Sequence, residues 1–211
     1  DVSKVTDMQS LFSGYSSFNG NITAWDVSSV TDMSNMFENA NAFTQDLSDW
    51  DTSSLTRLYR IFYTSNANPK VSNWDVSRVT SMSEVFSHAY SFNQDLSSWD
   101  VSSVTTMSEM FHNAGKYNQD LESWSTTLVT SMYHMFASTN SFNGKIGSWD
   151  VSHVTNMEWM FYNAKAFNQP VGKWDVRDAD AKSRAEERNF SFQRIYQPVT
   201  SSRAQLQACA R

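Results

Sequence analysis

The chain has 211 residues with a formal net charge of −6; 18% of them are charged and 14% aromatic. Only 6 Gly and 3 Pro occur, which excludes collagen-like and Pro/Gly-rich disordered chains, and 14 Phe, 8 Tyr and 8 Trp supply ample apolar surface for a core. No run of about 18 apolar residues occurs, so no transmembrane segment is expected. The single cysteine, Cys209, cannot form an internal disulfide.

The charge is unevenly distributed along the chain. Residues 1–176 carry 9 Lys and Arg against 18 Asp and Glu, whereas residues 177–211 carry 7 against 4. An acidic body is not attracted to phosphate backbones, so no nucleic-acid partner is expected. The basic excess of the last segment sets it apart from the body.

An internal repeat organises residues 1–176. Its fullest copy reads FNQDLSSWDVSSVTTMSEMFHNA, from Phe92 to Ala114. Seven of the eight tryptophans recur about 25 residues apart in this phrase: Trp25, Trp50, Trp74, Trp99, Trp124, Trp149 and Trp174. The third unit is one residue short near 66–70. Such a period is typical of stacked repeat proteins, in which each repeat packs only on its neighbours.

Within each unit the pattern predicts a short helix and an extended segment. Met33, Met36, Phe37 and Ala40 have the spacing of one helix face, and a preceding Thr is expected to cap the helix. Residues 22–27 are expected to form a strand that pairs in parallel with the next unit. The predicted fold is therefore a right-handed α/β solenoid of about seven strand–helix repeats, similar in geometry to leucine-rich repeats.

The quoted phrase resembles the bacterial surface protein repeat of about 26 residues, also called the mycoplasma lipoprotein repeat, a relative of the BspA-like leucine-rich repeats. The resemblance extends over residues 1–176. It implies a module of secreted or surface-anchored proteins with roles in adhesion and recognition, and it transfers no catalytic residue. It also leads us to expect that the chain is part of a larger protein.

Two polar columns have structural explanations that we favour over functional ones. The aspartates after the tryptophans, such as Asp26 and Asp100, suit Asx turns better than a calcium ladder. The asparagines Asn93, Asn143 and their equivalents suit a ladder of hydrogen bonds between units better than an ice- or carbohydrate-binding face.

No arrangement of catalytic or metal-ligating residues stands out. The four histidines, His88, His112, His134 and His153, lie at different offsets from the tryptophans, so we expect a surface scatter and no metal site. The Ser and Thr residues have no fixed His and Asp partners, so a hydrolytic triad is not supported. We therefore expect no enzyme activity, no cofactor and no bound metal.

Large aromatic residues stand at offsets that are otherwise polar, and these are the predicted binding residues: Tyr59, Tyr63, Tyr133, Trp159 and Tyr162. Aromatic side chains suit contacts with proteins or sugars. For Trp159 and Tyr162, packing beneath the terminal segment is an equal alternative.

Residues 177–211 are predicted to be a basic, partly helical cap or tail, with helices over 178–188 and 202–210. The function expected from these features is a non-enzymatic binding or adhesion module of an extracellular or cell-surface protein, which recognises a protein or glycan. The alternative is a structural subunit that docks into a larger assembly through its C-terminal tail.

Overall fold

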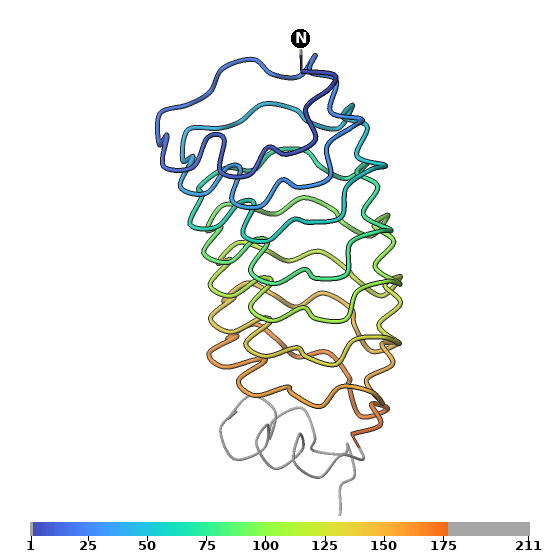
Figure 1. Cartoon of the computed structure of the whole chain (residues 1–211). Helices are drawn as coiled ribbons and strands as arrows, with labels where there is room; N and C mark the ends of the chain where they lie inside the picture. The colour runs from blue at the N-terminus through green and yellow to red at the C-terminus, as the bar shows by residue number, and fades with distance from the viewer. Residues whose placement is uncertain (1, 177–211) are drawn as a thin grey trace, which may run out of the picture.

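The computed structural model describes residues 2–176, in which the chain winds in coils stacked along one axis (Figure 1). Within these residues there is no helix and no extended strand. Neighbouring coils are joined by isolated parallel β-bridges, which pair Asp7 with Asp32, Asp32 with Arg57, Ser81 with Thr106, Thr106 with Ser131, and Ser131 with Asn156. The two runs of bridges are separated, between Arg57 and Ser81, at the unit that is one residue short.

The predicted α/β solenoid of strand–helix repeats is therefore wrong. Residues 22–27 do not form a strand, since the amide of Trp25 closes a turn onto the carbonyl of Ile22. The segment predicted as a helix consists of consecutive β-turns. The predicted cap and the helices of residues 177–211 lie outside the described residues.

The turns reproduce the apolar spacing of a helix. Met36 donates its amide to the carbonyl of Met33, and Ala40 donates to Phe37. The third residues of these two turns, Asn35 and Asn39, have φ of 57° and 56°, as type II turns require. Two successive four-residue turns place apolar residues at i, i+3, i+4 and i+7, which is the same pattern as a helix face.

Other amides of these two turns bond to the next coil. Asn35 donates to the carbonyl of Tyr59, and Phe37 donates to that of Ile61. These bonds keep adjacent coils close, and the Phe rings of one column stack with centroids 5.5–5.9 Å apart from coil to coil. Packed α-helices need 8–10 Å between axes, so a helix in every coil does not fit this spacing.

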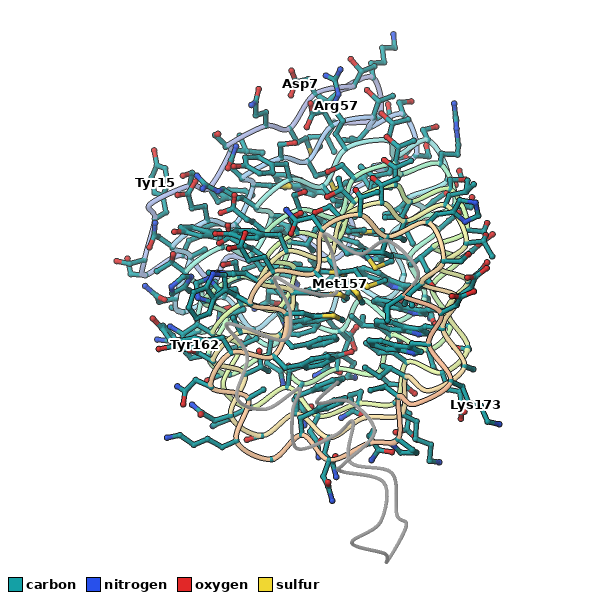
Figure 2. The ribbon with its side chains drawn as sticks, turned by 90° about the horizontal axis from the view of Figure 1, so that it is seen from below. Asp7, Tyr15, Arg57, Met157, Tyr162 and Lys173 are labelled. Atoms are coloured by element: carbon teal, nitrogen blue, oxygen red, sulfur yellow. The ribbon has the colours of Figure 1, made fainter. Side chains whose placement is uncertain are left out.

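The interior is filled by columns of similar apolar side chains. Six of the repeat tryptophans are buried and donate their indole N–H to a carbonyl of the preceding coil, at 2.8–3.3 Å: Trp50, Trp74, Trp99, Trp124, Trp149 and Trp174. The methionines lie inside, as Met157 does in Figure 2. Each coil thus buries its apolar residues only with help from its neighbours.

Threonine does not cap a helix here. The hydroxyl and the amide of Thr31 both donate to the carbonyl of Thr6 in the preceding coil. Four other threonines bond in the same way to the threonine carbonyl one coil before them: Thr56, Thr105, Thr130 and Thr155. These residues therefore hold adjacent coils together.

The structural explanations of the two polar columns are confirmed. The carboxylates of Asp26, Asp51, Asp75, Asp100 and Asp150 each accept the amide of the serine two residues on, which makes an Asx turn. The asparagine column forms a ladder in which a side-chain oxygen accepts a backbone amide of the next coil at 2.7–3.0 Å.

No helix long and apolar enough to span a membrane was found among the described residues.

A substitution at Asn113, one of the turn residues with positive φ, distinguishes the observed turns from the predicted helix. We expect Asn113→Ala to lower the free energy of unfolding by about 1 kcal/mol, because an L side chain at φ 59° is strained, whereas Asn113→Gly is expected to be nearly neutral. In a helix the order reverses, with Ala more stable than Gly by about 1 kcal/mol. Urea unfolding of both variants measures the order.

Tyr117 replaces phenylalanine in a buried column and carries a cost. Its hydroxyl is buried without a hydrogen-bond partner, and burial raises its pKa well above the usual value. We expect Tyr117→Phe to stabilise the chain by about 1 kcal/mol, which raises Tm by about 2–4 °C. The reverse change at the next coil, Phe142→Tyr, is expected to lower Tm, and a lower Tm for Tyr117→Phe would contradict this reasoning.

The Asx turns predict acid sensitivity. Hydrogen bonds from serine lower the pKa of Asp26, Asp51, Asp100 and Asp150, and a hydrogen bond from Lys70 is the main cause that lowers that of Asp46 to about 2. An aspartate whose pKa is lower in the folded than in the unfolded chain stabilises the fold when it is ionised. This contribution is complete at pH values above the unfolded pKa of about 3.9, and it is lost as the pH falls through the folded-state pKa.

Tm is therefore expected to fall as pH drops from about 4 toward 2. A variant with Asp51→Asn, Asp100→Asn and Asp150→Asn keeps acceptors for the turns but loses three titrating groups. Its Tm should depend less steeply on pH, as measured by circular dichroism melts; an unchanged slope would assign the acid sensitivity to other groups.

Candidate binding site

The five predicted binding residues lie along one side of the stack with three of the histidines. We call this set the aromatic–histidine strip; it contains Tyr59, Arg60, Tyr63, Glu84, His88, Glu109, His112, Tyr133, His134, Trp159 and Tyr162. Contacts between side chains connect the strip from Tyr59 to Tyr162. Tyr162 lies at the outer edge of the stack (Figure 2).

The N-terminal part of the strip is built around Arg60. Its guanidinium carbon lies 5.0 Å from the ring centroid of Tyr59 and 4.6 Å from that of Tyr63, and its Nη2 lies 2.6 Å from Oε2 of Glu84. The hydroxyl of Tyr59 donates to Oε1 of Glu84 at 2.9 Å. Burial and this hydrogen bond raise the pKa of Tyr59. Arginine therefore holds two tyrosines and a carboxylate in fixed positions.

Histidines form the centre of the strip. The ring of His88 lies 5.6 Å from Tyr63 and 4.8 Å from His112, and His112 lies 5.5 Å from His134, measured between centroids. Nδ1 of His112 is 3.3 Å from Oε2 of Glu109. Burial, followed by the charge on His112, lowers the pKa of His88 and His134. The lowered pKa favours the neutral form of both rings.

The C-terminal part is aromatic. Tyr133 stacks on His134 with centroids 4.1 Å apart, and Trp159 contacts His134 at 6.1 Å and Tyr162 at 4.8 Å, both edge to face. Tyr162 is 49% exposed, as expected for a ligand contact, whereas Tyr133 and Trp159 are half-buried. The strip therefore combines anchored rings with exposed ones.

The expectation that the histidines are scattered was wrong. His112 comes from one coil and His134 from the next, and their donor nitrogens lie with a carboxylate oxygen of Glu109 within 4.8 Å of one another. The three residues are all half-buried. Their donor atoms are of the types that bind transition-metal ions. His153 alone is not part of the strip.

A signal for this cluster was present in the repeat. Counted from the preceding tryptophan, His134, His112 and His88 occupy offsets ten, thirteen and fourteen. Offsets three and four apart lie on one face of consecutive turns just as they do on a helix. Residues on that face in adjacent coils meet even though they share no column.

Much of the strip occupies unfavourable backbone conformations. Arg60, Glu84, Glu109, His134 and Trp159 have φ between 53° and 59°. Asparagine or glycine is the inexpensive choice at such positions, and a bulky side chain there is unusual. In the neighbouring left-handed column Gly14, Asn39, Asn113 and Asn163 follow that preference, whereas Thr64, His88 and Ser138 depart from it. Strained residues of this kind concentrate at functional sites.

Comparison with known proteins supports the repeat. No match was found among curated proteins or among solved structures. A family model described as "Mycoplasma protein of unknown function, DUF285" matches residues 1–68, 63–143 and 99–197. These overlapping matches extend over most of the chain, and the repeated residues within them build the stacked coils. The chain belongs to this DUF285 family of repeat-containing Mycoplasma proteins.

Proposed function

We propose that the chain is a non-enzymatic recognition module that binds a glycan or protein through the aromatic–histidine strip. One observation carries the proposal. Aromatic and charged side chains occupy the left-handed column from Arg60 to Trp159, where asparagine or glycine costs less. The stack gains nothing in backbone stability from Trp159 at φ 59°, so a contact with a ligand is the explanation we favour.

The chemistry of the strip suits such a ligand. The rings of Tyr133, Trp159 and Tyr162 offer apolar faces with polar edges, which are effective at protein and carbohydrate contacts. Arg60 and Glu84 add a fixed charged pair at the other end. Ring stacking already holds Tyr133 against His134, so little side-chain entropy is lost on binding.

We also propose that the module acts in a secreted or cell-surface protein, supported by the resemblance of its repeat to surface-protein repeats. The relationship to BspA-like leucine-rich repeats is proposed at the level of the repeated phrase alone, since the coils contain turns where those repeats would have helices. The alternative role as an assembly subunit depends on the tail at 177–211, which is outside the described residues.

The test compares binding of the full chain with that of a strip variant on a glycan array and a peptide display library. We expect Tyr133→Ser with Trp159→Asn to weaken any specific ligand at least about tenfold, because each buried aromatic contact contributes on the order of 1 kcal/mol or more. Asparagine suits the backbone of position 159, so the variant is expected to fold.

Tyr15→Ser is the matched control, because Tyr15 is an exposed tyrosine of the first coil, with 63% of its surface accessible. It should leave binding unchanged. Equal binding by the strip variant and the native chain would refute the proposal, as would a loss in the control of the same size.

A further inference from the structure

One group of side chains in the strip has the composition of a metal site. Glu109 and His112 lie three residues apart in one coil. His134 occupies the same position in the next coil as Glu109 does in its own. The backbone fixes all three, since the amide of Glu109 donates to the carbonyl of Tyr133, that of His112 to Glu109, and that of His134 to Glu158. The donor atoms converge within 4.8 Å from two adjacent coils.

A second observation concerns His134 itself. Nε2 of His134 is buried and has no hydrogen-bond partner. Leaving a buried polar atom without a partner destabilises the fold, because the atom has lost its contact with water. Within the cluster, the carboxylate of Glu109 makes one hydrogen bond, between its Oε2 and Nδ1 of His112 at 3.3 Å. A cation placed between these groups would satisfy the imidazole lone pair and the carboxylate together.

We propose that Glu109, His112 and His134 bind a Zn²⁺ ion, with water in the fourth position. Two imidazoles and one carboxylate are a recurrent zinc ligand set, whereas Ca²⁺ and Mg²⁺ require oxygen ligands. Tetrahedral coordination at 2.0–2.1 Å places donor atoms about 3.3 Å apart. Side-chain rotation closes the difference from 4.8 Å, and the half-buried positions allow the ion to enter.

The ion would tie two adjacent coils together in the middle of the strip. It would also hold His134 in the orientation in which Tyr133 stacks on it at 4.1 Å and Trp159 meets its edge. Zinc binding goes beyond the proposed recognition function and does not depend on it, because it is measured with the metal alone.

The experiment is a calorimetric titration of the metal-free full chain with Zn²⁺, and with Mg²⁺ and Ca²⁺ as comparison ions. We expect one Zn²⁺ per chain. Glu109→Gln, His112→Ala and His134→Asn should each weaken it roughly 10- to 100-fold or more. Asparagine tolerates the φ of 53° at position 134, so this variant is expected to keep its fold, and a circular dichroism spectrum checks this.

Two variants serve as controls. His153→Ala removes the histidine outside the strip, and Cys209→Ser removes the single thiol; both variants should bind Zn²⁺ as tightly as the native chain. Substitution with Co²⁺ should give the intense visible absorption of a four-coordinate site, absent in His134→Asn.

Several results would overturn the proposal. These are the absence of saturable one-to-one Zn²⁺ binding, equal affinity in the folded His134→Asn variant, or a loss in His153→Ala or Cys209→Ser as large as in the ligand variants. Equally tight binding of Mg²⁺ or Ca²⁺ would overturn the choice of metal. A failed glycan or peptide screen would leave these results unaffected, so the two proposals fail separately.

Discussion

The close spacing of successive coils is the constraint on which the rest of the structure depends. Phenylalanine rings repeat every 5.5–5.9 Å along the stack, and backbone amides reach carbonyls of the next coil. This distance suits stacked backbones and aromatic rings but is too short for packed helices. Each coil must therefore satisfy its amides partly through its neighbours and partly through tight turns.

The same constraint creates the site. Turns that close every four residues need a left-handed residue at their third position, which gives two left-handed columns along one side of the molecule. Side chains in these columns point away from the core and repeat at the coil spacing. Groups such as Glu109 and His134, 25 residues apart in sequence, are consequently direct neighbours in space. A stacked fold thus builds clusters from residues that look unrelated along the chain.

The periodicity predicted the core well. The columns of Trp, Phe and Met expected from the repeat are buried, with Trp99 and Phe111 as examples, and the Asx turns and the asparagine ladder formed as expected. The helix prediction failed for a definite reason. Two successive type II turns and one helix give the same spacing for Met33, Met36, Phe37 and Ala40, so local pattern alone cannot separate them.

The sequence by itself determined the repeat, its family and the residues that fill the interior, because burial of similar apolar side chains imposes a period of about 25 residues that is visible in the sequence. It also identified Tyr133 and Trp159 as departures from that period. Only the tertiary structure decided that turns replace helices, since the distance between coils is a property of the whole stack. Only the tertiary structure brought His88, His112 and His134 together, because contact between coils depends on the face a residue occupies as well as its column.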